Sequence, residues 1–115
     1  MIQTKRVYES SSKDDGFRIL VDKIWPKGVS KERPNLNLWM KKIASSDNLR
    51  KWLLHDPKKW EEFGFKYKEE LKDKNGLISK INEIEKDKKN VTLIYSAKDK
   101  EHNNAIVLLN ILKKS

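Results

Sequence analysis

Cysteine is absent from this chain of 115 residues, and glycine and proline are scarce, with four and three residues respectively. Without cysteine the chain forms no disulfide bond, no thiolate metal site and no cysteine nucleophile. The few glycines build no glycine-rich phosphate loop, and no motif of a zinc protease or a serine esterase is present. Two histidines are too few to indicate a zinc site. We therefore expect no metal and no cofactor.

Long hydrophobic runs are missing as well. No window approaches the ~18 apolar residues of a membrane span, and the first residues lack the apolar core of a signal peptide. The length fits one domain, and four Trp, three Tyr and three Phe supply bulky material for a core. We expect a cytoplasmic protein that folds as a single domain over residues 1–115, with no membrane partner. Its oligomeric state stays open.

Positive charge is in excess, since Lys and Arg number 26 against 17 Asp and Glu, a formal net charge of +9. Such a balance suggests a nucleic-acid partner. Most of the excess is lysine, however, and it alternates with glutamate along expected helices such as residues 58–72, which is typical of solvated helix faces. A nucleic-acid partner is therefore one alternative beside a role of the charge in solubility.

Three segments have the character of β-strands, at residues 2–8, 17–24 and 91–96. The second and third contain continuous apolar runs, Ile19 to Val21 and Val91 to Tyr95, which are typical of strands covered on both faces. The long helical stretch between these two strands favours a parallel pairing through a right-handed crossover. The sequence therefore predicts an α/β fold with a short, mostly parallel sheet.

Five segments have the apolar spacing of amphipathic helices. Ser45-Ser46 and Asp56-Pro57 provide caps at which two of them begin, and the last helix begins at about Lys100. The apolar positions are, in chain order, Leu36, Trp39, Met40 and Ile43; Leu49, Trp52 and Leu53; Trp60, Phe63, Tyr67 and Leu71; Leu77, Ile78, Ile81 and Ile84; and Ala105, Leu108, Leu109 and Leu112.

The loop after the third strand is the first candidate site, because ligands of open parallel sheets bind beyond the carboxyl ends of the strands. Here Ser96, Lys98 and Asp99 precede His102. A helix that starts at this point offers unpaired N–H groups and the positive end of its dipole, which favour an anion. Lys98 would add positive charge and His102 a group able to transfer a proton. Asp99 is also a natural N-cap.

The loop after the second strand would meet this site at the same edge of the sheet. Asp22 ends an apolar strand, where a carboxylate is either paired or part of a site. Trp25 and Lys27 would add a rigid wall and a basic side chain. The cations available to pair with Asp22 are Arg6, Arg18, Lys23 and Lys27.

Three further residues complete the candidate set. Arg50 and His55 lie in the helical crossover, and His55 precedes the cap Asp56, so a structural role for it is an alternative. Asn103 and Asn104 are poor helix formers at an expected helix start, which indicates a polar role there.

Several motifs in order resemble a known family. They are Lys5-Arg6-Val7-Tyr8, Asp15-Gly16, Trp25-Pro26-Lys27-Gly28, Leu49-Arg50-Lys51-Trp52, His55-Asp56-Pro57, residues 93–99 and His102-Asn103. Together they are similar to the YeaO-like branch of the DUF488 family, a domain of unknown function. The resemblance implies a small cytosolic α/β domain of bacteria and archaea with no settled activity. Lys23 and Lys27 stand where the family usually has Arg, and Ser46 where it has Pro, so bidentate binding of an anion at Lys27 is lost.

Three functions follow as hypotheses. The first is a pocket for a small anionic ligand, bearing phosphate or carboxylate, at the carboxyl edge of the sheet. Its ligand-binding residues would be Ser96, Lys98, Asp99, Asn103, Arg50, Trp25 and Lys27; if it were an enzyme, His102, His55 and Asp22 would be catalytic. The alternatives are a basic domain associated with nucleic acid and a protein-interaction module.

Overall fold

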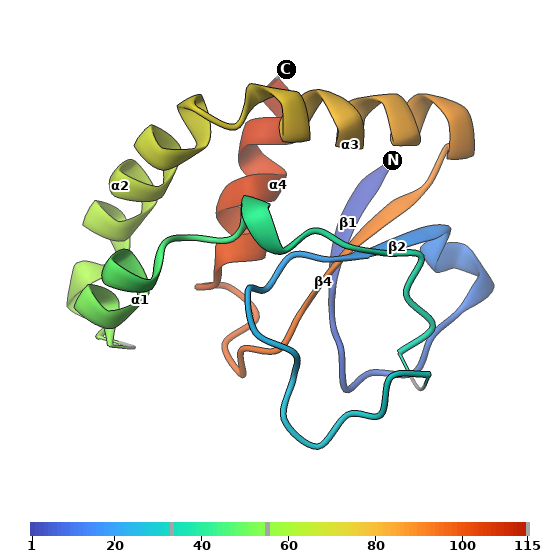
Figure 1. Ribbon diagram of the computed structural model, residues 1–115, viewed down its shortest axis with the longest axis horizontal. Helices are drawn as coiled ribbons and strands as arrows, with labels where there is room; N and C mark the ends of the chain where they lie inside the picture. Colours follow the sequence, from blue (N-terminus) through green and yellow to red (C-terminus); the bar gives the residue numbers. More distant parts are fainter. Residues whose placement is uncertain (33, 55, 115) are drawn as a thin grey trace.

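The residues that the structure describes include four parallel strands, which form one sheet in the order β1-β4-β2-β3 (Figure 1). They are β1 (Ile2–Arg6), β2 (Phe17–Leu20), β3 (Leu38–Trp39) and β4 (Val91–Tyr95). The computed structural model describes residues 1–32, 34–54 and 56–114. In the ladder Arg6 lies opposite Tyr95, and Leu20 lies opposite Ile94. The carboxyl ends of β1, β2 and β4 therefore reach the same edge of the sheet. The predicted α/β fold, with the strands at residues 17–24 and 91–96 parallel, is confirmed.

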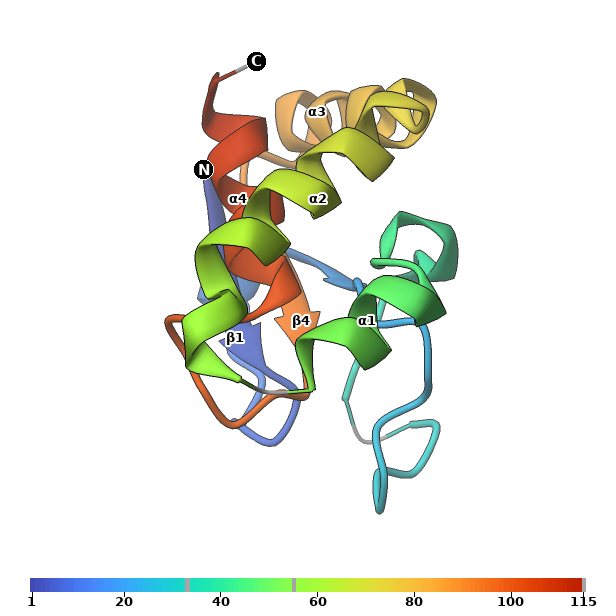
Figure 2. The same ribbon diagram turned by 90° about the vertical axis from the view of Figure 1, so that its left-hand side faces the viewer.

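The described residues also form four α-helices: α1 (Asp47–Leu53), α2 (Trp60–Lys72), α3 (Asn75–Lys88) and α4 (Asn104–Lys114). Short 3-10 helices are η1 (Lys13–Asp15), η2 (Lys41–Ile43) and η3 (Pro57–Lys59). α4 packs on β1 and β4, α2 packs on α4, and α1 packs on α2 (Figures 1 and 2). Within the described ranges, no helix is both long enough and apolar enough to cross a bilayer.

Both faces of the sheet are covered, which explains the continuous apolar runs of its two inner strands. The main core lies on the helix side, where Ile19, Leu93 and Tyr95 meet residues of all four α-helices. A smaller core on the opposite side contains Leu20 and Ile94. It is covered by the loop between β2 and β3, through Trp25, Val29 and Leu36. β4 is consequently buried at every position.

The amphipathic helix expected over residues 36–43 is wrong. This stretch contains β3 and η2, because its backbone pairs with β2: the Asn37 N–H donates to Arg18 O at 2.9 Å and the Met40 N–H to Leu20 O at 2.9 Å. Trp39 packs edge-on against Trp25, 5.1 Å between ring centroids, on the loop side of the sheet. Four apolar residues over so short a span fit helical spacing as well as the strand-and-turn path that the chain takes.

The strands are also shorter than expected. The first ends at Arg6 instead of residue 8, and the second ends at Leu20 instead of residue 24. The two caps at Ser46 and Asp56 are confirmed: Ser46 Oγ accepts from the Leu49 N–H at 3.1 Å, and Asp56 Oδ1 accepts from the Lys58 N–H at 3.0 Å.

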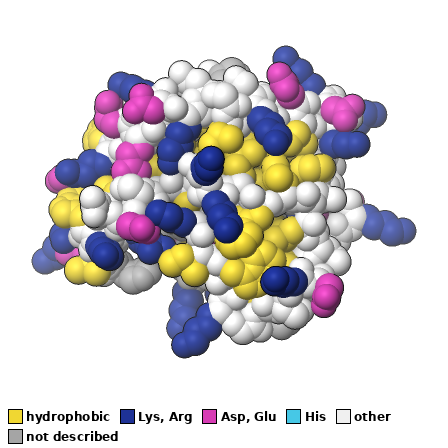
Figure 3. All heavy atoms as spheres, viewed as in Figure 1, with side chains coloured by type: hydrophobic (Ala, Val, Ile, Leu, Met, Phe, Trp, Pro, Cys, Tyr) yellow, Lys and Arg dark blue, Asp and Glu magenta, His cyan; other side chains and the backbone are white. Residues whose placement is uncertain are grey.

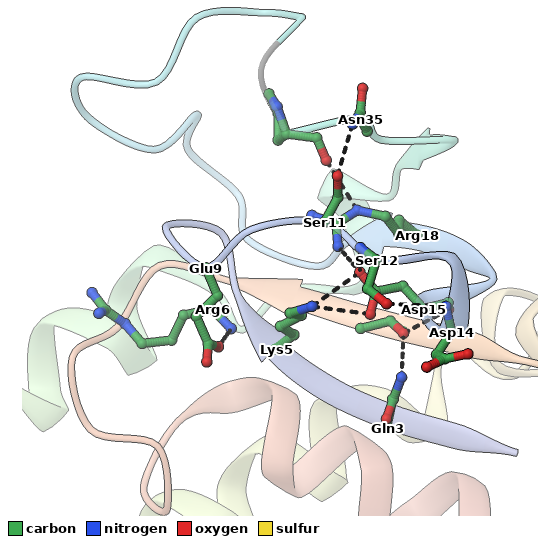
Figure 4. A network of polar contacts seen from close by, with 12 residues as sticks. Gln3, Lys5, Arg6, Glu9, Ser11, Ser12, Asp14, Asp15, Arg18 and Asn35 are labelled. Carbon is green, nitrogen blue, oxygen red and sulfur yellow. Dashed lines mark hydrogen bonds and ion pairs between the residues drawn. The ribbon is translucent and has the colours of Figure 1, made fainter.

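A polar network closes the amino end of the sheet (Figure 4). Asp15 is 3% exposed and binds two cations, Lys5 Nζ at 3.1 Å and the guanidinium of Arg18. Its backbone carbonyl accepts from Thr92 Oγ1 at 2.7 Å. Gly16 follows with φ of +64°, and a Cβ there would lie 2.3 Å from the carbonyl oxygen of Asn90, so only glycine fits this close approach.

Candidate functional site

A cavity of about 210 Å³ lies at the carboxyl edge of the sheet, where the two predicted loops meet. Leu53 of α1 and Phe63 of α2 form part of its apolar wall. Its polar and charged lining residues are Asp22, Lys23, Ser45, Arg50, Ser96, His102, Asn103 and Asn104. Five of the residues selected from the sequence, namely Asp22, Arg50, Ser96, His102 and Asn103, therefore line one cavity.

Asp22 and Ser96 join the two loops directly. One carboxylate oxygen of Asp22, Oδ2, accepts from the Ser96 backbone N–H at 2.9 Å and from the Ser96 hydroxyl at 2.8 Å. The contact follows from the parallel pairing of β2 with β4, since Asp22 and Ser96 are the first polar residues beyond the two strand ends. Asn104 braces the same corner by donating from Nδ2 to the Val21 carbonyl at 3.0 Å.

The pKa of Asp22 is raised by its environment. Burial raises the pKa of this carboxyl group above its ordinary value of 3.8, and the bonds from Ser96 and Asn104 and the charge of Arg50 offset this only in part. The predicted pairing of Asp22 with Arg6, Arg18, Lys23 or Lys27 is wrong. Arg18 and Lys23 bind other carboxylates, those of Asp15 and Asp47, and Arg6 binds backbone carbonyls.

Arg50 and Lys23 bring positive charge to the mouth of the cavity. Both contact Asp47, Lys23 Nζ at 3.0 Å and Arg50 Nη2 at 3.2 Å. All three side chains are about half exposed, so these ion pairs are weak and leave the cations able to bind a second anion. Asp22 is the only carboxylate among the described residues that line the cavity.

The position of Arg50 depends on how α1 is fastened to α2. Glu70 on α2 accepts from the backbone N–H of Ser46 at 2.9 Å and from its hydroxyl at 2.5 Å. Tyr67, one turn earlier, donates its buried hydroxyl to the Ile43 carbonyl at 2.6 Å. These bonds fix the segment that contains Ala44 and leads into α1, and with it one wall of the cavity.

The loop after β4 is held by Arg6. Its guanidinium donates from Nε to the Ala97 carbonyl at 2.8 Å and from Nη2 to the Ser96 carbonyl at 3.4 Å. The sequence offered Arg6 only as a partner for Asp22, and its contact with the loop after β4 was not expected. Its position at the end of β1, the strand next to β4, is the signal that predicts such a contact once the strand order is known.

Asp99 and His102 form a turn ahead of the last helix. Asp99 Oδ1 accepts from the N–H groups of Glu101 at 2.9 Å and His102 at 3.0 Å, and Oδ2 lies 2.9 Å from His102 Nδ1. The hydrogen bonds from Glu101 and His102 hold the pKa of Asp99 below its ordinary value. The His102 ring packs edge-on against Trp60, with 5.1 Å between the ring centroids.

The start of the last helix differs from the expectation. α4 begins at Asn104, and Asn103 caps it by accepting from the Ile106 N–H at 3.0 Å. Asp99 therefore caps the preceding turn and not the helix. Asn103 therefore already binds one first-turn amide of α4, that of Ile106.

Four predicted ligand-binding residues lie outside the cavity lining: Lys98, Lys27, Trp25 and Asp99. Lys98 and Lys27 are exposed. Trp25 belongs to the loop-side core and donates from Nε1 to the Val29 carbonyl at 2.7 Å. His55 lies outside the described residues. Asp99 lines a second, smaller hollow of about 120 Å³ together with Pro57, Trp60 and His102.

Sequence reasoning missed the walls of the cavity. Ala44, Leu53 and Phe63 were assigned no site role, because small and apolar residues carry no chemical signal of a binding site. Asn104 was indicated by its poor helix propensity at a helix start. Over the part of the chain that the structure describes, no group of three or more His, Asp and Glu side chains is placed to hold a metal ion.

Comparison with known proteins gives a consistent family relation. Residues 1–115 match the family model DUF488-N3i, described as the inactive DUF488-N3 subclade. The uncharacterized protein YeaO of Escherichia coli (strain K12) is 38% identical over 112 residues, 97% of this chain and 96% of that protein. The uncharacterized protein Rv3073c of Mycobacterium tuberculosis (strain H37Rv) is 43% identical over 76 residues, and this match spans 66% of this chain and 64% of the relative. No solved structure matches the chain significantly.

Proposed function

The chain belongs to the DUF488 family, in the subclade described as inactive DUF488-N3, and from this premise we propose that it binds a small anionic ligand without turning it over. The ligand carries a phosphate or carboxylate group and occupies the cavity between the loops that follow β2 and β4. The description of the subclade as inactive supports binding in preference to catalysis. Ligand binding also explains why family motifs lie at this edge of the sheet, and it requires no reaction.

The charge arrangement of the cavity carries the proposal. Arg50 and Lys23 lie at its mouth, whereas Asp22, the one carboxylate among the described lining residues, is already bound by Ser96 and has a pKa that burial raises. An arginine at the rim of a partly apolar cavity offers paired N–H donors to a phosphate or carboxylate.

Asp22 also decides how the ligand is oriented. Its Oδ2 takes the Ser96 N–H, the amide at the strand end that an anionic group would otherwise use. The anionic group of the ligand therefore lies toward Arg50. Hydroxyl or amine groups of the ligand point toward Asp22, which accepts from them. The cavity of about 210 Å³ is below the roughly 300–1,000 Å³ of drug-sized sites, so the ligand is small.

His102 and Asp22 are the described residues that would serve proton transfer if the cavity were catalytic. His102 Nδ1 binds Asp99, which leaves Nε2 as the other ring nitrogen available to a ligand. In the proposed binding role, His102 contributes a hydrogen bond and Asp22 an acceptor. Asn103 and Asn104 keep the opposite wall in place through their bonds to Ile106 and Val21.

Thermal unfolding with a panel of inorganic phosphate, sulfate and citrate, at constant ionic strength set by chloride, tests the proposal. At twenty times its Kd a ligand stabilises the native state by about 1.8 kcal/mol, a rise in Tm of several degrees. Arg50→Gln is expected to abolish this rise. Lys51→Gln is the matched control, because it removes the same charge from the next residue of α1, which does not line the cavity.

Loss of the rise in Arg50→Gln with retention in Lys51→Gln supports the pocket. An equal rise in wild type and Arg50→Gln, or no rise with any anion in wild type, contradicts it.

A further inference from the structure

A third hollow, which we call the lysine groove, lies beside the cavity and shares Lys23 with it. It has a volume of about 950 Å³ and is lined by four lysines, Lys23, Lys41, Lys42 and Lys74, with Asp73 as its one acidic residue. They come from the loop after β2, from η2 and from the turn between α2 and α3. Figure 3 shows Lys and Arg side chains gathered near the middle of this face, over the region of η2 and that turn in Figure 1.

The positive charge of the groove is compensated in part, because Lys23 is paired with Asp47 and Asp73 is one of the lining residues. Lys41 and Lys42 are exposed, and within the described ranges neither forms an ion pair. Lys74 lies deeper and donates to the Ala44 carbonyl at 3.0 Å, which places its ammonium group in the floor. Lys41 also lies over the Trp39 ring, 4.1 Å from the centroid, so its position is restricted.

We propose that the lysine groove binds the phosphate backbone of double-stranded nucleic acid, without recognition of bases and without need of the small-anion cavity, with which it shares Lys23, Ala44 and Ser45. Several lysines around one open hollow suit a row of phosphates, because each ammonium is a point charge that contacts a phosphate oxygen from many directions. A single small anion would leave most of these cations unused.

The lining also indicates which part of the nucleic acid is bound. Apart from its charged residues the groove is lined by Ala44, two serines, Gly76 and Leu77, and no aromatic ring is among its described lining residues. Binding of single strands relies on bases stacked on aromatic side chains. Arg, Asn and Gln, which form bidentate contacts with base edges, are missing from the described lining residues of the groove. The groove is therefore built for backbone contact. The net charge of +9 adds long-range attraction for the same partner.

The salt dependence of affinity measures this contact directly. Each phosphate neutralised by a lysine releases counterions and contributes about −0.9 to the slope of log K against log salt concentration. Contact through three to four lysines therefore predicts a slope of about −3 for wild type with a 20-base-pair duplex. Lys41→Gln combined with Lys42→Gln removes two contacts, so the slope changes to about −1 and affinity in 50 mM salt falls at least tenfold.

A second double variant controls for overall charge. Lys58→Gln combined with Lys68→Gln removes the same charge from exposed positions on η3 and α2 that lie outside the groove. Its slope and affinity are expected to stay close to those of wild type. Fluorescence anisotropy of a labelled duplex, titrated between 50 and 300 mM KCl, gives both quantities.

Equal losses in the two double variants would overturn the proposal, because the binding would then depend on net charge and not on the groove. So would absence of duplex binding in 50 mM salt, or binding of inorganic polyphosphate alone. The small-anion cavity is tested separately: Lys41→Gln with Lys42→Gln should keep the stabilisation by phosphate, and Arg50→Gln should keep duplex binding. If Arg50→Gln abolished both activities, the groove would not be independent.

Discussion

An aspartate lies at each end of β2, one fully and one partly buried, and the two have different kinds of bonding partner. Asp15, just before the strand, is bound by the cations Lys5 and Arg18. Asp22, just after it, is bound by the neutral donors of Ser96. Burial alone raises the pKa of both, but around Asp15 the bonds from Ser12, Lys5 and Arg18 outweigh it, so the pKa of Asp15 is lowered and that of Asp22 is raised.

The difference separates a structural end of the sheet from a binding end. A buried carboxylate paired with two cations has its charge satisfied and holds the turn before β2 in place. A partly buried carboxylate with no cation bonded to it, beside a cavity, keeps an oxygen for another molecule. Perturbed carboxyl groups in a cleft are common at functional sites, whereas lowered pKa values in ion-pair networks are common in structural ones.

The largest expected effect comes from Asp15→Asn. The substitution leaves the guanidinium of Arg18, itself 3% exposed, buried without its anion. Removal of one partner of such a pair costs about 3–5 kcal/mol. Urea unfolding at pH 7 measures the loss, and Asp14→Asn, the same change at the exposed neighbour, should stay within about 0.5 kcal/mol of wild type. A loss below about 1 kcal/mol for Asp15→Asn would show that the network does not hold this end together.

A smaller effect of different sign is expected from Asp22→Asn. The pKa of Asp22 is raised in the folded state, so folding takes up a proton at pH values between 3.8 and that higher pKa. At pH values above the folded-state pKa, the charged carboxylate lowers the stability of the fold. Wild type should therefore lose stability relative to Asp22→Asn as the pH rises from about 4 to 7, with the variant at least as stable at pH 7.

Asp15 predicts the reverse pH dependence. Its folded-state pKa lies below the unfolded value of 3.8, so its contribution is present above that pH and is lost as the pH falls through the lower folded-state pKa. Urea unfolding of the two variants and wild type at several pH values from 3 to 7 compares the slopes. Equal slopes for the two carboxylates would remove the distinction between the ends.

The meeting of Asp22 with the loop at Ser96 was predictable, because the parallel pairing of β2 and β4 places both strand ends at one edge. The partner of Arg18 was not. Along a strand, residues four apart lie about 13 Å from each other, so Arg18 cannot reach Asp22. It reaches Asp15 instead, because the turn at Gly16 folds back over the start of β2. The path of that turn was not predictable from the sequence.

Two further predictions from the sequence were wrong because they too depend on tertiary contacts. Asp99 and Asn103 are both good N-cap residues four positions apart, and only the packing of Ala105 and Leu108 in the core decides that α4 starts after Asn103. Lys98 was expected in the site because it follows the strand closely, but the loop carries it to the surface. Positive charge comes instead from Arg50 of α1, a distant segment whose position is set by tertiary contacts to α2.

A backbone NMR titration with inorganic phosphate at pH 7 and constant ionic strength tests the central claim most directly. The claim is that the carboxyl edge of the sheet binds an anion and the amino edge does not. The amide signals of Ser96, Ala97 and Arg50 are predicted to shift along saturating curves with one common Kd, while those of Asp15 and Gly16 stay in place. Linear shifts without saturation, or shifts spread over the surface lysines with none at Ser96, would contradict the account.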